Sequence, residues 1–158
     1  MKLVLIPAAI LVTVMAMAPA QTRPRALVSN LKNNSVADGC GCYFQFRSTP
    51  ENSDRYIFFS SIEADGNKTA WMNIDGEDVK LKLERKSGPW GTEREEPRGS
   101  RSTVKYAAAG ITVIGTYVVT RVCARDDENC ESTGYSVTFV VKKGTRLQIV
   151  KAKGGCGC

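Results

Sequence analysis

The chain has 158 residues, with 22 lysines and arginines against 16 aspartates and glutamates, and it has no histidine. The lack of histidine excludes Ser-His-Asp and Cys-His nucleophile activation and any histidine-ligated metal site. The formal net charge of +6 is not gathered into a basic run, so we predict no nucleic-acid partner.

The first twenty residues have the pattern of a cleavable signal peptide. Lys2 precedes an apolar run of about fifteen residues, shorter than the roughly twenty that a membrane-spanning helix needs. Ala18-Pro19-Ala20 then supplies a small-x-small cleavage motif. Removal of residues 1–20 takes Lys2 away and changes the net charge from +6 to +5. We therefore expect a secreted or periplasmic protein with no membrane span.

Two regions of different texture follow the signal peptide. Residues 21–38 are mostly polar and irregular, and we predict a flexible N-terminal arm there. Residues 39–158 consist of short runs of β-branched and aromatic residues separated by Gly, Asp and Asn, which is typical of strands joined by tight turns. We expect these residues to form one β-rich domain.

Eight strands are predicted in that domain, with no amphipathic helix. Asp75-Gly76 is a strong signal for a type I′ hairpin turn, because both central residues of that turn need a positive φ. Eight short antiparallel strands predict an all-β fold, either a small barrel or a sandwich. The predicted strands are residues 43–47, 56–62, 69–74, 79–83, 103–108, 111–122, 135–141 and 146–150. The predicted core includes Phe44, Phe46, Ile57, Trp71, Val79, Leu81, Leu83, Val113, Tyr117, Val137, Phe139, Leu147 and Ile149.

The strand pattern is interrupted over residues 84–101, which contain two prolines, three glycines and nine charged residues. Long loops of this kind in compact domains are often functional. Trp90 with Arg94, Arg98 and Arg101 is typical of a recognition loop, in which an aromatic anchor stands among arginines. The simpler interpretation is that Trp90 folds back onto the domain while the charges stay in water. We predict this loop as the contact surface for a protein or small-molecule ligand.

Six cysteines in an exported domain predict a disulfide framework. Residues 39–42 and residues 155–158 both read Gly-Cys-Gly-Cys, and we call these segments the two tetrads. We expect the tetrads to be joined to each other and the other two cysteines, which flank one loop, to pair. A bridge across more than a hundred residues would remove about 4–5 kcal/mol of unfolded-chain entropy. The six predicted disulfide residues are Cys40, Cys42, Cys123, Cys130, Cys156 and Cys158.

Two other interpretations of the tetrads remain open. Their four thiolates could bind Cu(I) or Zn, since soft metals favour thiolate ligands. Alternatively, Cys156-Gly157-Cys158 could exchange disulfides as a redox centre, with Lys151 and Lys153 stabilising a thiolate.

No catalytic residue is predicted. Adjacent acids such as Glu95 and Glu96, or Asp126, Asp127 and Glu128, are interpreted as solvated surface groups, because nothing nearby would raise the pKa of an acid in either group. The sequence therefore predicts an exported, non-enzymatic binding or structural domain without a cofactor. The alternative is a cysteine-based metal carrier or thiol-redox protein.

Overall fold

The computed structural model describes residues 25–33, 39–50, 53–62, 69–88, 96–124, 130 and 132–157. The signal peptide and its cleavage motif lie outside these ranges, so both stay predictions. Within these ranges, no helix is long and apolar enough to cross a membrane. The described strands are β1 (Val28–Ser29), β2 (Gly41–Phe46), β3 (Phe58–Ser61), β4 (Thr69–Ile74), β5 (Glu77–Ser87), β6 (Arg101–Ala108), β7 (Ile111–Arg121), β8 (Ser132–Lys143) and β9 (Arg146–Gly157).

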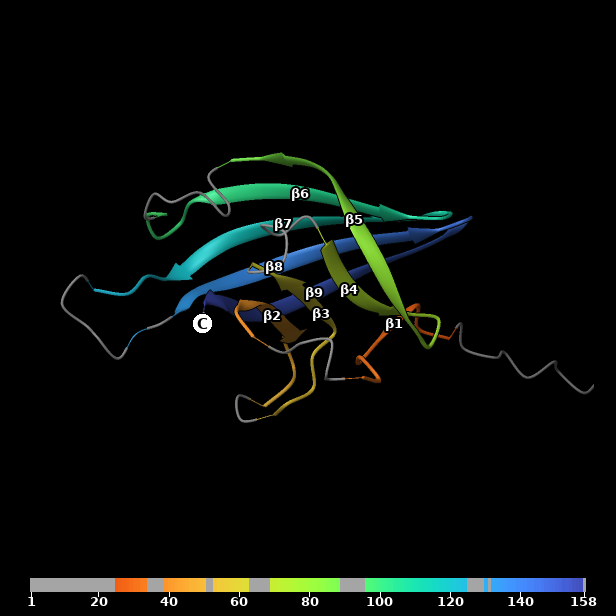
Figure 1. The fold of residues 1–158 in the computed structure, drawn as a ribbon, viewed down its shortest axis with the longest axis horizontal. Coiled ribbons are helices and arrows are strands. Elements are labelled where there is room, and N and C mark those ends of the chain that lie inside the picture. Colours follow the sequence, from red (N-terminus) through yellow and green to blue (C-terminus); the bar gives the residue numbers. More distant parts are fainter. Residues whose placement is uncertain are drawn as a thin grey trace, which may run out of the picture.

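Strands β2 to β9 close into an eight-stranded antiparallel barrel (Figure 1). Each strand pairs with the next one in the chain, and β9 returns to pair with β2. The short β1 extends the sheet beside β4, where Val28 lies opposite Ile74. The all-β prediction is confirmed, and the closed ring of pairings makes the fold a barrel rather than a sandwich.

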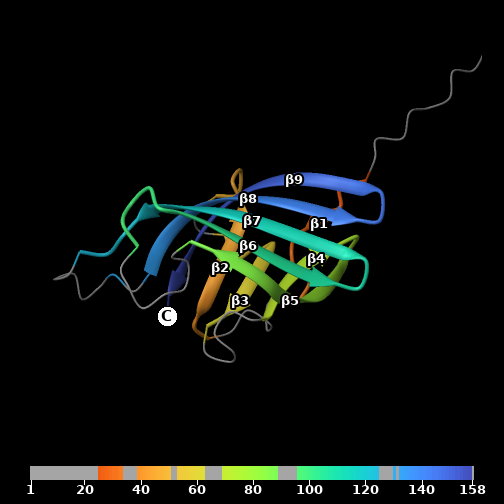
Figure 2. The ribbon, with the colours of Figure 1, turned by 90° about the horizontal axis from the view of Figure 1, so that it is seen from above.

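The long strands β6 to β9 lie side by side across one side of the barrel, and the shorter strands β2 to β4 lie across the other (Figure 2). Three tight turns, β4–β5, β6–β7 and β8–β9, stand at one end. We call it the strap end, because residues 25–33, which are described below as the strap, cross the barrel there. The opposite end, where β2 begins and β9 ends, is called the disulfide end. The predicted type I′ turn is confirmed, since Asp75 has a φ of 57° and Gly76 a φ of 83°.

Aromatic side chains fill the interior of the barrel. Their ring centroids lie 4.9 to 6.4 Å apart, mostly in edge-on or tilted arrangements, which are the favourable ones. All six rings are at most 5% exposed. A barrel of eight strands is just wide enough for side chains to fill, and here rings occupy the space. The six residues are Phe44, Phe58, Tyr106, Tyr117, Tyr135 and Phe139.

Two glycines make room for this packing. A Cβ atom on Gly115 would lie 2.6 Å from the ring of Tyr117 on the same strand. A Cβ atom on Gly154 would lie 1.8 Å from the carbonyl oxygen of Tyr43 on β2. Gly154 is therefore required where β9 passes close to β2.

The predicted core is mostly confirmed, but its assignment is wrong in β9. Leu147 and Ile149 are 61% and 62% exposed, while Val150 and Ala152 face the interior. The predicted strand of five residues was too short to show which alternate residues face inwards. The polar Gln148 lies on the inward side together with Val150, so this side did not look apolar in the sequence. The confirmed buried residues are Phe44, Ile57, Leu81, Val113, Tyr117, Val137 and Phe139, and those partly buried against them are Phe46, Val79 and Leu83.

Residues 25–33, which we call the strap, cross one end of the barrel. Leu27, Val28 and Leu31 are only 3%, 2% and 7% exposed. These residues therefore pack on the domain and do not form the separate flexible arm that the sequence predicted for residues 21–38. The remainder of that segment lies outside the described ranges, and the domain boundaries stay predictions. The strap is too short to show a periodic pattern of apolar residues. Its burial comes from contacts with strands that are distant in sequence, so the local sequence does not show it.

Gln148 of β9 holds the middle of the strap. Its side-chain Oε1 atom accepts hydrogen bonds from the backbone N–H groups of Leu27 at 2.6 Å and Val28 at 3.0 Å. The carbonyl of Leu27 in turn accepts a bond of 2.7 Å from the N–H of Asp75 in the β4–β5 turn. The inward-facing glutamine thus satisfies two backbone donors that a β-ladder would otherwise pair.

Asp78 of β5 holds the end of the strap. Its carboxylate accepts hydrogen bonds from the backbone N–H groups of Lys32 at 3.0 Å and Asn33 at 2.9 Å, and from the side chain of Asn73 at 2.6 Å. Burial opposes ionisation of Asp78. The three donors and the charge of Lys32 outweigh burial and hold the pKa of this carboxyl below its usual value.

Asp75 ties two turns together across the strap end. Its carboxylate lies 2.8 Å from Nζ of Lys143 and 2.5 Å from Nη1 of Arg146, both beside the β8–β9 turn. These hydrogen-bonded cations lower the pKa of Asp75. Arg146 also donates a bond of 3.0 Å to the carbonyl of Arg25 in the strap. The β8–β9 hairpin is therefore fixed against both the strap and the β4–β5 turn.

Candidate functional site

The two tetrads meet at the disulfide end. Cys42 and Cys156 are directly opposite each other on β2 and β9, with an S–S distance of 2.08 Å and Cα atoms 4.0 Å apart. This bridge confirms the prediction that the tetrads are joined to each other. Cys40 is disulfide-bonded as well, and Cys158 lies outside the described residues.

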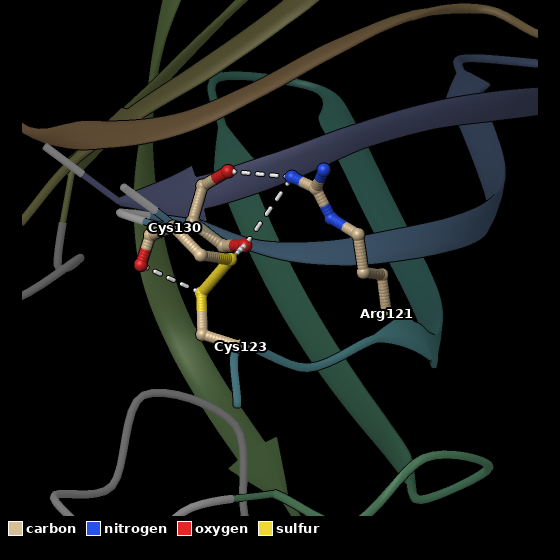
Figure 3. Close-up of a disulfide and its surroundings, with 4 residues drawn as sticks. Arg121, Cys123 and Cys130 are labelled. Atoms are coloured by element: carbon tan, nitrogen blue, oxygen red, sulfur yellow. Dashed lines mark hydrogen bonds between the residues drawn. A yellow bond between two sulfur atoms is a disulfide. The ribbon is translucent and has the colours of Figure 1, made fainter. Parts of the chain in front are cut away.

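The second predicted bridge, Cys123–Cys130, is also confirmed, with an S–S distance of 2.15 Å. It ties the end of β7 to the start of β8. Arg121 lies beside it, and its guanidinium donates hydrogen bonds to the hydroxyl of Ser132 at 2.9 Å and to the carbonyl of Ser132 at 3.4 Å (Figure 3). Arg121 therefore holds the start of β8.

The two disulfides affect the alternative interpretations of the protein as a metal carrier or a thiol-redox protein. A sulfur atom in a disulfide is not a thiolate, so the joined Cys42 and Cys156 would need reduction before they could bind a soft metal. None of the described cysteines is free. In the part of the chain that the structure describes, no group of three or more Cys, Asp or Glu side chains could hold a metal ion.

The predicted contact loop is described only in part. Trp90 and Arg94 lie outside the described residues, so their grouping with the other arginines stays a prediction. Arg98 stands exposed in a turn, and Arg101 is the exposed first residue of β6. The loop is shorter than predicted, because β5 continues through a bulge into its first residues.

One acid of this loop is not solvated. Glu96 is 8% exposed, and it accepts a hydrogen bond from the hydroxyl of Tyr135. Burial, together with the charge and hydrogen bond of Glu96, raises the pKa of Tyr135. Burial and the neighbouring Tyr106 and Tyr135 raise the pKa of Tyr117 well above its usual value. The interpretation of Glu96 as a surface group is wrong, and no local pattern in the sequence marks it as buried.

The outer side of β2 to β4 carries aromatic side chains. The rings of Tyr43 and Phe59 lie 4.9 Å apart, and those of Tyr43 and Tyr56 lie 5.3 Å apart. Trp71 is opposite Phe59 in register, and Nζ of Lys80 lies 5.9 Å from its ring centre. Trp71 therefore faces outwards, half-buried, and its assignment to the core is wrong.

The outer side of β6 to β9, which we call the β6–β9 face, has a different character. Ile114, Val140 and Ile149 stand directly opposite one another on three strands, and Leu147 stands opposite Lys142 one step nearer the β8–β9 turn. Ile114 and Val140 are half-buried, but Leu147 and Ile149 are more than 60% exposed. These aliphatic side chains form a row across the strands, which a soluble domain rarely leaves uncovered without a reason.

The same four strands carry eight basic residues and no acidic one. Lys105 pairs with Glu84 of β5 at 2.6 Å, and two others pair with the β4–β5 turn as described above. Among the described residues, Lys142, Lys151 and Lys153 are not in an ion pair. The eight basic residues are Arg101, Lys105, Arg121, Lys142, Lys143, Arg146, Lys151 and Lys153.

An open hollow of about 350 Å³ adjoins this face at the strap end, between the β6–β7 and β8–β9 turns. It is wide open to solvent, and polar and small side chains line most of it. The hollow shares Lys142 with the β6–β9 face, and the carboxylate of Glu84 lines it as well. The lining residues are Glu84, Ala107, Ala108, Gly110, Ile111, Thr112, Lys142 and Gly144.

Comparison with models of known protein families, with curated proteins and with solved structures gives no match. The fold and surface chemistry of this chain therefore carry the functional argument. They define a disulfide-bonded meander barrel with a side-chain-filled interior and two chemically distinct outer faces.

Proposed function

We propose that the protein is an exported, non-enzymatic binding domain whose contact surface is the β6–β9 face. The observation that carries the proposal is the coincidence of an exposed aliphatic row with outward-facing basic residues on strands that contain no acidic residue. The outward-facing basic residues are Arg101, Lys105, Lys142, Lys151 and Lys153. The two disulfides are consistent with an oxidising environment outside the cytosol.

Two other observations support an external contact surface. The aromatic rings inside the barrel are buried and pack against one another. They therefore form the hydrophobic core and do not line a ligand cavity. The predicted contact loop leads directly into the β6–β9 face, because Arg101 opens β6 on its outer side.

Charge reversal tests the proposal. We expect the variant Lys142→Glu/Lys151→Glu/Lys153→Glu to weaken binding to dextran sulfate and to phosphatidylserine vesicles by more than about tenfold, because each lost cation near an anionic surface contributes roughly fivefold. The matched control Lys80→Glu/Lys82→Glu/Arg85→Glu changes the net charge equally but acts on β5. Equal weakening in both variants would show that net charge, and not this face, causes binding.

A further inference from the structure

We propose that the partner of the β6–β9 face is an anionic lipid surface, into whose headgroup region Leu147 and Ile149 insert. This proposal rests on the proposed function above and names the partner of the same face. It concerns peripheral attachment of the folded barrel to a surface.

Leu147 and Ile149 are placed for insertion. They are 61% and 62% exposed on the outward side of β9, close to the β8–β9 turn at one end of the barrel. The turn is tied to the β4–β5 turn, because Lys143 and Arg146 both bind Asp75. A hairpin tied in this way loses less conformational freedom than a free loop would when two of its side chains leave water.

Cations surround the two aliphatic side chains. Lys142 stands directly opposite Leu147 in register, and Lys151 follows Ile149 on the same side of β9. Neither lysine is in an ion pair among the described residues. Stable attachment to a membrane surface requires two signals together, and an apolar group with a basic patch is such a combination.

The composition of the face favours lipid over a protein or a single-stranded nucleic acid. Protein interfaces are enriched in aromatic residues and arginine and depleted in lysine, and single-stranded nucleic acids are held by aromatic stacking platforms. All aromatic side chains of β6 to β9 point into the barrel: Tyr106, Tyr117, Tyr135 and Phe139. The outward side offers mainly aliphatic, lysine and threonine side chains, with Ser136 and a single arginine, Arg101, at its edge. Apolar side chains such as leucine beside a lysine-rich surface are one of the combinations that interfacial membrane anchors use.

Vesicle flotation of the mature chain tests this inference, with phosphatidylcholine vesicles prepared with and without phosphatidylserine. We expect binding only to the anionic vesicles and a loss of roughly tenfold or more in the variant Leu147→Ser/Ile149→Ser. The matched control is Ile62→Ser, which alters an isoleucine that is 37% exposed directly after β3, away from the β6–β9 face. That control should bind as the original protein does. The thermal unfolding midpoint of every variant should stay within about 2 °C of that of the original protein, since surface substitutions rarely alter stability.

The outcomes separate the two proposals. If dextran sulfate is bound through Lys142, Lys151 and Lys153 but vesicles are not, the face is correct and the lipid is wrong. If Leu147→Ser/Ile149→Ser binds vesicles unchanged, insertion is wrong. If that variant converts a dimer into a monomer in sedimentation analysis, the face is an interface between copies of this chain. If neither probe binds, the proposed function fails as well.

Discussion

The two ends of the barrel are closed by different chemistry. At the disulfide end, Cys42–Cys156 and Cys123–Cys130 link strands covalently, and the buried Glu96 bonds to Tyr135. At the strap end, backbone N–H groups of residues 25–33 are held by a glutamine and an ionised carboxylate. The first end should therefore respond to reductant and alkali, and the second to acid, although one hydrophobic core runs between them.

The largest effect is expected at the disulfide end. Replacing Cys156 and Cys158 with serine should lower the free energy of unfolding by about 2–5 kcal/mol, because the Cys42–Cys156 link spans 114 residues of sequence. Urea denaturation measures the change. The matched control is Cys123→Ser/Cys130→Ser, whose bridge spans 7 residues and contributes roughly 2 kcal/mol less in the loop-closure model. Equal losses in the two variants would contradict this account.

The strap end should show the next largest effect. Leu27→Ala is expected to lower the free energy of unfolding by about 2–4 kcal/mol, because Leu27 is 3% exposed in the core. Leu147→Ala is the matched control with the same chemical change, and should have an effect within about 0.5 kcal/mol, since Leu147 is 61% exposed. If amide exchange in β4 stays slow in Leu27→Ala, the strap does not protect this end.

The sequence predicts the long strands well and their glycine-rich ends poorly. Residues 111–122 and 135–141 were assigned from alternation, and the structure has β7 and β8 there. The predicted end of the last strand at residue 150 is wrong, because β9 continues to Gly157. Glycine disfavours strands in general, but Gly154 is needed here for the close approach to β2. Such a requirement comes from a strand distant in sequence, so the local pattern does not show it.

The candidate surface was likewise hidden from the sequence. Along the chain, charges of both signs are interspersed, and Glu77 and Asp78 stand near Lys80 and Lys82. In the fold, outward-facing residues of four consecutive strands come together, and those strands contain no acid. The separation of basic from acidic side chains therefore arises from two features together: the alternation of side chains along each strand and the order of the strands in the barrel. The alternation was visible in β8, but the phase of β9 was not.

Alkali should distinguish the two ends. The pKa values of Tyr117 and Tyr135 are raised above the usual 10.0, so their neutral forms stabilise the fold. This contribution is complete below about pH 10 and is lost as the pH rises through the folded-state values. Tyr135→Phe removes the donor to buried Glu96 and should lower stability by about 1–3 kcal/mol at neutral pH.

The same variant should also weaken the fall of unfolding free energy above pH 10, because one titrating group is missing. Urea titrations across this pH range measure both effects. Tyr56→Phe serves as the control, since Tyr56 is only half-buried outside the core cluster. An alkaline slope that is the same in Tyr135→Phe and the original protein would contradict the assignment.

Acid should open the strap end with the smallest change in global stability. The pKa of Asp78 lies below its usual value of 3.8, so its ionised form stabilises the fold, and this contribution is complete above about pH 4. As the pH falls through the folded-state pKa, protonation weakens the bonds to Lys32 and Asn33. Asp78→Asn should reproduce this at neutral pH, with a loss of about 1 kcal/mol and faster amide exchange at both residues.

Amide exchange followed by NMR separates this local opening from global unfolding. We expect acid to accelerate exchange at Lys32 and Asn33 before it affects β7, because the carboxylate of Asp78 accepts the hydrogen bonds of these two N–H groups. Glu77→Gln is the matched control, since Glu77 contacts the strap through an exposed ion pair with Lys32 at 3.3 Å, which contributes little to stability. If acid releases both ends of the barrel together, or if Asp78→Asn leaves exchange at Asn33 unchanged, then Asp78 does not govern closure of the strap end.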